Sequence, residues 1–281
     1  MSRDRGERII RSILVALDAS PHSLAALEAA VELASRFGAE LSGLYVEDIN
    51  LLRLAELPFA QEVGQFSAHR RQLDVQELER QMRAHTLRVR RIFQGTSRRA
   101  EVHWSFSVTR GRVEREVLSA ATEADMLVLG RAGWSLVRPG RMGSTARAVL
   151  ARAPGWALLL QEGACLGQPV VVVYDGSPLA QKGLDAAAAL LEENRWMTIL
   201  LLAAEPQSVE SLKAQVSAWL GERDIQVRYR ILTRLNVPSL VDALETEGCG
   251  TVVLPARSAI LDDAALQALL NEIRVPVLLV R

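Results

Sequence analysis

Lysine is nearly absent from this chain of 281 residues, since Lys182 and Lys213 are the only two. A Walker-type phosphate loop requires Gly-Lys-Ser/Thr, and a protein kinase requires a lysine on a strand of its nucleotide lobe. Neither is possible before Lys182. Any phosphate bound in the first half of the chain must therefore be met by backbone N–H groups and arginines.

Cysteines and long apolar runs are also scarce. Cys165 and Cys249 are the only cysteines, and their separation excludes a paired redox or metal motif and a disulfide framework. The longest apolar runs, residues 156–160 and 170–174, are far shorter than the ~20 residues that cross a bilayer. The charged residues 1–8 do not resemble a signal peptide. We therefore expect a cytoplasmic protein without membrane insertion.

Net charge and histidine content exclude further classes of function. Lys plus Arg and Asp plus Glu both number 33, so no overall charge attracts nucleic acid or an anionic membrane. The four histidines show no metal-ligand spacing, and we expect no metal site built from them. Aromatic residues make up 5% and are not interleaved with arginines in a way that would stack bases. No nucleic-acid partner is expected.

One stretch combines a strand, a glycine loop and a helix start. The buried-strand pattern Met126–Leu129 leads into Gly130-Arg-Ala-Gly133, and Gly143-Ser144-Thr145 opens a segment with helical spacing. This order places unbonded backbone N–H groups at the N-terminal, positive end of a helix, and the glycines allow an anion to come close to them. Taken singly, these residues could also serve only as a tight turn and a helix cap.

The second half of the chain repeats the first. Residues 170–178 align with residues 13–21 without a gap, and residues 251–254 align with 126–129. Alternating strands and helices in both copies predict two doubly wound, mostly parallel α/β domains related by internal duplication. We place them at residues 1–162 and 169–281, with a helical insert at about 47–96 in the first.

Within that insert, residues 70–99 hold nine arginines against three acidic residues. A solvated helix face explains this surplus most simply. An acidic protein surface or membrane headgroups are the alternatives.

The glycine spacing resembles the nucleotide-binding pattern of the universal stress protein family. Gly130, two residues, Gly133, nine residues and Gly143-Ser144 match it, and Ile13–Asp18 followed by Ala-Ser-Pro resembles the family's opening strand. The resemblance implies a tandem member with Rossmann-like domains and ATP, with or without magnesium held through Asp18, at the carboxyl ends of the strands. No carboxylate pair is spaced to activate water, so we expect no catalytic residue. The expected nucleotide-site residues are Ala16, Leu17, Asp18, Val46, Gly130, Arg131, Gly133, Arg141, Gly143, Ser144 and Thr145. Without a lysine in this half of the chain, the arginines that could meet phosphate charge are Arg131, Arg138, Arg141 and Arg147, and we expect Arg131 and Arg141 to do so.

The second copy has lost this motif. Pro255 and Ser258 stand at the positions of Gly130 and Gly133, and Asp262 and Asp263 stand where the phosphate-side helix begins. Carboxylates favour a helix start and would take the place of a phosphate. The sequence therefore predicts one nucleotide per chain, bound by the first copy.

Three functions fit these patterns. The first is an ATP-binding cytoplasmic regulatory protein of the stress response with a protein partner that the sequence does not identify. The second is a slow ATPase or phosphotransferase that uses the same site, although no general base is visible. The third is a structural interaction module. The resemblance also implies an intramolecular pseudo-dimer formed through the last strands, residues 157–160 and 277–280, with or without a further homodimer.

Overall fold

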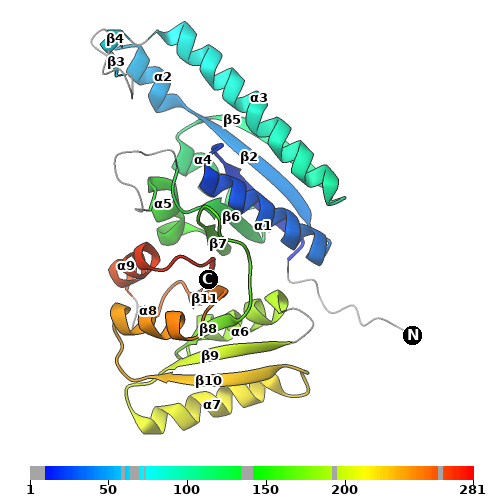
Figure 1. Ribbon diagram of the computed structural model, residues 1–281, viewed down its shortest axis with the longest axis vertical. Coiled ribbons are helices and arrows are strands. Elements are labelled where there is room, and N and C mark those ends of the chain that lie inside the picture. Colours follow the sequence, from blue (N-terminus) through cyan, green and yellow to red (C-terminus); the bar gives the residue numbers. More distant parts are fainter. Residues whose placement is uncertain are drawn as a thin grey trace.

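The computed structural model describes residues 10–57, 61–63, 70–72, 74–133, 142–191, 195–258 and 262–281. Its centre is a ten-stranded sheet that both halves of the chain share (Figure 1). The strand order is β10-β9-β8-β11-β12-β7-β6-β1-β2-β5. Every neighbouring pair in this sheet is parallel except β12 and β7, which are antiparallel.

The first half contributes five strands of this sheet and a separate small hairpin. Ser20 and Pro21 start the first helix as the sequence predicts, because the Ser20 hydroxyl accepts the N–H of Ser23 at 3.2 Å. The elements of the first half are β1 (Ser12–Leu17), α1 (Pro21–Phe37), β2 (Glu40–Asp48), α2 (Ile49–Ala55), β3 (Gln61–Val63), β4 (Arg70–Gln72), α3 (Val75–Arg99), β5 (Trp104–Gly111), α4 (Val113–Ala121), β6 (Met126–Gly130), α5 (Ser144–Arg152) and β7 (Trp156–Leu160).

The second half repeats this plan without the hairpin. Its elements are β8 (Val170–Tyr174), α6 (Pro178–Leu190), β9 (Trp196–Leu202), α7 (Pro206–Leu220), β10 (Gln226–Leu232), α8 (Val237–Thr246), β11 (Thr251–Pro255), α9 (Asp263–Glu272) and β12 (Val277–Val280). In both halves the main strands follow the spatial order third, second, first, fourth, fifth. The predicted fold class, two doubly wound Rossmann-like units related by duplication, is therefore confirmed.

Helices cover both faces of the sheet, which is why its strands read as continuous apolar runs. Alternate residues of β1 belong to different cores. Ile13 and Val15 belong to the core that also includes buried residues of α1, α3, α6 and α7, whereas Leu14 belongs to the core that includes those of α4, α5, α8 and α9. Each core extends through both halves of the chain. Among the described residues, no helix is both long and apolar enough to cross a membrane.

The last strands of the two halves pair with each other, as the pseudo-dimer prediction requires. Leu158 of β7 faces Leu278 of β12 in the antiparallel ladder, and both side chains are fully buried. A strand at the edge of a sheet exposes unpaired backbone groups to other chains. Pairing β7 with β12 removes two such edges and joins the halves into one sheet.

The predicted insert at residues 47–96 is too broad. It contains most of α3, which connects parallel strands β2 and β5 in the way that α7 connects β9 and β10. A parallel pair requires such a crossover helix, so α3 belongs to the common plan. The additional elements of the first half are α2, the β3–β4 hairpin and the greater length of α3.

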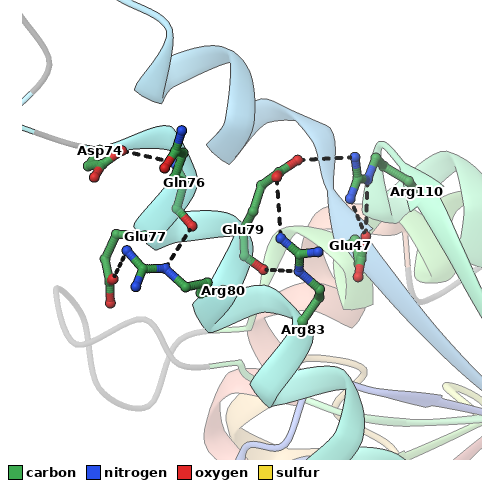
Figure 2. A network of polar contacts seen from close by, with 8 residues as sticks. All are labelled: Glu47, Asp74, Gln76, Glu77, Glu79, Arg80, Arg83 and Arg110. Atoms are coloured by element: carbon green, nitrogen blue, oxygen red, sulfur yellow. Dashed lines mark hydrogen bonds and ion pairs between the residues drawn. The ribbon is translucent and has the colours of Figure 1, made fainter.

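The long helix α3 is anchored to the sheet at both of its ends. Towards its start, Arg110 of β5 contacts Glu47 of β2 at 2.9 Å and Glu79 of α3 at 3.8 Å (Figure 2). Further along, Phe93 is fully buried against the rings of Trp104 and Phe106. These contacts fix α3 across the ends of β2 and β5.

Candidate functional site

A cavity of about 300 Å³ lies at the carboxyl ends of β1, β2 and β6. Strands β2 and β6 lie on opposite sides of β1, so the chain order reverses between β1 and β6. Open α/β sheets bind ligands at such a switch point, outside the carboxyl ends of the strands. The cavity is lined by Ala16, Leu17, Asp18, Ser23, Leu44, Val46, Val113, Val117, Leu129, Gly130, Arg131, Ala132, Gly133, Gly143, Ser144, Thr145 and Ala146.

The cavity brings together ten of the eleven residues that the sequence predicts. Strand β1 contributes Ala16 and Leu17, with Asp18 directly after it, and strand β2 contributes Val46. The end of β6, the loop that follows it and the start of α5 contribute the others: Gly130, Arg131, Gly133, Gly143, Ser144 and Thr145. Arg141 lies outside the described residues.

The helix α5 begins at the cavity without a side-chain cap. Gly143 is its N-cap residue and has no side chain to accept a hydrogen bond from the first turn. The N-caps of α1, α6 and α9 each accept such a bond, from Ser23, Ala180 and Ala265. The first-turn N–H groups of α5 and its positive helix end are thus presented to the cavity.

Two glycines of the loop are required by close contacts of different kinds. A Cβ atom at Gly130 would lie 2.8 Å from the backbone carbon of His22 and 2.9 Å from the nitrogen of Ser23, so Gly130 lets β6 pack on α1. A Cβ atom at Gly133 would lie 2.8 Å from Oδ2 of Asp18. Because Gly133 has no side chain, the backbone of the loop can lie this close to the Asp18 carboxylate.

Asp18 is held in place by the chain that follows it. Its Oδ1 accepts the N–H of Ser20 at 2.9 Å, and its own N–H donates to the hydroxyl of Ser23 at 3.4 Å. These bonds orient the carboxylate at the end of β1, where it lines the cavity. A carboxylate there can accept bonds from hydroxyl groups or bind a divalent cation.

In the second half, a serine side chain binds the carboxylate that corresponds to Asp18. Asp175 matches Asp18, and its Oδ1 likewise accepts the N–H of Ser177 at 2.9 Å. Its Oδ2 accepts the hydroxyl of Ser258 at 2.6 Å. Ser258 stands where the first half has Gly133, so the second half places a serine hydroxyl on its carboxylate at a position where the first half has no side chain.

The helix start of the second half is also occupied. Oδ1 of Asp262 accepts the N–H of Ala265 at 2.7 Å, and Asp263 adds a second carboxylate to the first turn of α9. Pro255, at the position of Gly130, has no N–H to donate. The altered residues therefore lie where the sequence places them, and they leave an acidic, capped helix start.

The side chain of Arg131 does not follow the prediction that it meets phosphate charge. It is 6% exposed, and its guanidinium donates to the backbone carbonyl of Ile273 at the end of α9. Burial, together with the charge of Arg274, lowers the pKa of Arg131 to about 10, which leaves it cationic at neutral pH. The acceptor lies 142 positions away in sequence, so local sequence patterns gave no indication of this contact.

Sequence reasoning missed the apolar wall of the cavity. Val113 and Val117 lie one turn apart on α4, and Leu44 and Leu129 come from β2 and β6. The four-residue spacing of the valines indicated a helix face that packs on the core, but it did not distinguish core from cavity. With the uncapped start of α5, the site has an apolar wall and an anion-accepting end, the combination typical of small-molecule pockets.

Similar folds occur among solved structures. A universal stress protein from Archaeoglobus fulgidus superposes with a TM-score of 0.72 at 16% identity, covering 96% of this chain and 98% of that one. A putative universal stress protein from Pseudomonas aeruginosa gives 0.56 at 14% identity, covering 97% and 94%. A functionally unknown protein from Pseudomonas aeruginosa gives 0.56 at 15% identity, covering 97% and 93%. These likenesses show the fold over both halves.

Sequence comparison gives the family. A search of curated proteins finds no match. The sequence model of the universal stress protein family matches residues 10–159, which is more than half of the chain and includes the glycine loop and the start of α5. The chain therefore belongs to the universal stress protein family.

Proposed function

We propose that the chain binds ATP in the cavity of its first half and acts as a nucleotide-dependent regulatory protein of the stress response. The observation that carries this proposal is the uncapped start of α5, which faces a cavity at the switch point of the sheet. Backbone N–H groups at a helix N-terminus bind phosphates well. The glycine spacing that leads to α5 is the family's nucleotide pattern.

The cavity offers a different kind of contact to each part of a nucleotide. The wall of Val46, Val113 and Val117 suits an apolar, flat base. The Asp18 carboxylate suits ribose hydroxyls, or a magnesium ion that accompanies the phosphates. The first turn of α5 suits the phosphates themselves. Arg141 remains a proposed phosphate ligand, whereas the side chain of Arg131 is assigned to Ile273.

Binding without efficient turnover follows from the chemistry of the lining residues. The first half has no lysine, and Asp18 is the one carboxylate among the described residues that line the cavity. Its Oδ1 already accepts the N–H of Ser20. Backbone donors that bind the ground state and the transition state alike do not accelerate hydrolysis. A slow ATPase or phosphotransferase is the second candidate, and release of ADP by the purified protein tests it.

Regulation would act through a conformation or partner surface that nucleotide occupancy favours. A ligand shifts an equilibrium only as far as its affinities for the two states differ. The candidate partner surface is formed by α2, the β3–β4 hairpin and the arginine-rich α3, which is longer than its counterpart α7. On α3, Arg80 and Arg83 form ion pairs with Glu77 and Glu79 (Figure 2), so part of the arginine surplus is compensated locally.

The bound ligand itself is the test. Protein purified from cells without added nucleotide is denatured, and the released small molecules are identified by mass spectrometry. ATP or ADP near one equivalent supports the proposal. An empty protein that also fails to bind added ATP refutes it and favours the structural interaction module.

A further inference from the structure

The glycine loop of the first half contacts the end of α9 in the second half. The Arg131 guanidinium donates to the Ile273 carbonyl, and Nε2 of Gln161 donates to the same oxygen at 2.8 Å. The N–H of Met142, next to the N-cap of α5, donates to Oδ1 of Asn271 at 3.3 Å. The two sides of the loop, before and after residues 134–141, are thus both attached to α9.

The Ile273 carbonyl is well suited to hold a buried guanidinium. Ile273 is the C-cap residue of α9, where the helix dipole places partial negative charge. A buried cation is stable only when acceptors replace its lost water. The carbonyl supplies such an acceptor for Arg131, which is 6% exposed.

The backbone of Arg131 is hydrogen-bonded to the residue that begins α5, the helix that borders the cavity. Its backbone N–H donates to Leu160 at 2.7 Å, and its carbonyl accepts the N–H of Gly143 at 2.9 Å. Gly143 is the N-cap residue of α5. The contacts from Ile273 through Arg131 to Gly143 therefore connect the second half to the N–H groups that face the cavity.

The reverse arrangement is absent at the corresponding residue of the second half. Ala256 stands at the position of Arg131, and its N–H donates to Val280 just as that of Arg131 donates to Leu160. Alanine has no side chain that could reach the other half. We call the contacts of Arg131 and Met142 with α9 the tether. The second half also reaches the first, since the Arg281 guanidinium donates to the carbonyl of Leu150 in α5, but Ala256 supplies no counterpart to the side chain of Arg131.

We propose that the end of α9 positions the nucleotide loop of the first half, with Arg131 and Asn271 as positioning residues. The second half, whose own helix start is capped by Asp262, thereby contributes to nucleotide affinity without binding nucleotide. This inference rests on the proposed ATP site. It assigns a role to the altered repeat, whose own loop has alanine at the position of Arg131.

The test uses the full chain and variants at the two attachment points. Arg131→Met keeps an apolar stem without the guanidinium, and we expect ATP affinity to fall about tenfold, or about 1.4 kcal/mol. Asn271→Ala removes the acceptor of the Met142 N–H but no residue of the cavity lining, and we expect a fall of about threefold. Gln267→Ala is the matched control: it removes an amide one turn earlier on α9, for which the described residues show no hydrogen bond to the first half, and should leave affinity unchanged.

Two further readouts separate positioning from direct phosphate contact. Removing a phosphate contact makes affinity less sensitive to salt, because screening weakens charge attraction. We expect Arg131→Met to keep the salt dependence of the original chain. We also expect Asn271→Ala to speed hydrogen exchange of the amides at 142–146 in the nucleotide-free protein, with the thermal midpoint unchanged.

The outcomes distinguish this inference from the proposed function. An original chain that binds no ATP refutes the proposed function, while faster exchange in Asn271→Ala would still support the tether. An original chain that binds ATP, together with an Asn271→Ala variant of unchanged affinity and exchange, overturns the inference alone. A flattened salt dependence in Arg131→Met also overturns it, because Arg131 would then be a phosphate ligand.

Discussion

Replacing Gly143 with aspartate should stabilise the protein and abolish nucleotide binding. Gly143 has φ −65° and ψ 162°, close to the φ −71° and ψ 173° of Asp262, which caps α9. Among the described residues, a Cβ atom at Gly143 would meet no atom nearer than 3.7 Å, which is ordinary van der Waals contact. The new carboxylate can accept the N–H of Ala146 as Asp262 accepts that of Ala265.

The substitution is expected to raise the stability of the fold and to lower the affinity for ATP. A cap bond gains a few tenths of a kcal/mol over glycine, and a carboxylate at a helix start gains roughly 0.3–1 kcal/mol. The thermal midpoint should therefore rise by about 1–4 °C for a chain of this size. Against a phosphate about 5 Å away, the same carboxylate costs roughly 0.8 kcal/mol per charge pair in water and about 3 kcal/mol near a protein surface.

Several phosphate charges together should lower ATP affinity at least about 100-fold. Calorimetric titration and thermal unfolding measure the two effects on the same samples. Gly143→Asn is the matched control, because asparagine caps as well as aspartate without its charge; it should weaken binding far less. A Gly143→Asp variant that binds ATP normally, or one that unfolds earlier than the original chain, would refute this reasoning.

Three other predictions concern stability and reactivity. Gly130→Ala should destabilise the fold by about 1–3 kcal/mol in denaturant titration, because its Cβ would lie 2.8 Å from the backbone of His22; Gly143→Ala, with ordinary contacts, should cost much less. Burial raises the pKa of Asp125. The N–H groups of Arg11 and Ser12, the Ser12 hydroxyl and the charge of Arg11 together lower the pKa by more than burial raises it, so the pKa of Asp125 lies below its usual value. Asp125→Asn should therefore lower the free energy of unfolding by roughly 1–2 kcal/mol at pH 7. The difference between the two proteins should have its full size above the unfolded pKa of about 3.9 and should disappear as pH falls through the lower pKa of the folded state. A constant difference down to pH 2 would contradict this prediction. Burial raises the pKa of the Cys249 thiol to about 12, whereas Cys165 is exposed, so a thiol reagent at neutral pH should label one cysteine in the folded chain and two in denaturant; labelling of Cys249 without unfolding would show that the core is open.

Much of the fold could be predicted because strong local patterns agree with the repeat. The apolar runs at residues 13–17 and 126–129 are buried strands, and Ser20-Pro21 begins α1. The pairing of β7 with β12 was implied by the family resemblance, and the apolar character of both strands agrees with it. The domain limits at residues 162 and 169 stay predictions.

The remainder depends on contacts between distant residues. Nothing near Arg131 in sequence indicates that its guanidinium reaches Ile273. The apolar spacing of α3 does not by itself distinguish a crossover helix from an inserted one, and its role follows only from the pairing of β2 with β5. Val113 and Val117 carry the spacing of any buried helix face, and the packing of α4 beside β1 and β2 makes them a cavity wall.

The number of ATP molecules bound per chain tests the central claim most directly. The first half presents an uncapped helix start at its cavity, and the second presents Asp262 and Asp263 at the matching place. Calorimetric titration of the full chain should give a site number near one that Asp262→Ser leaves unchanged and Gly143→Asp abolishes. A site number near two, or one site that persists in Gly143→Asp, would contradict the account.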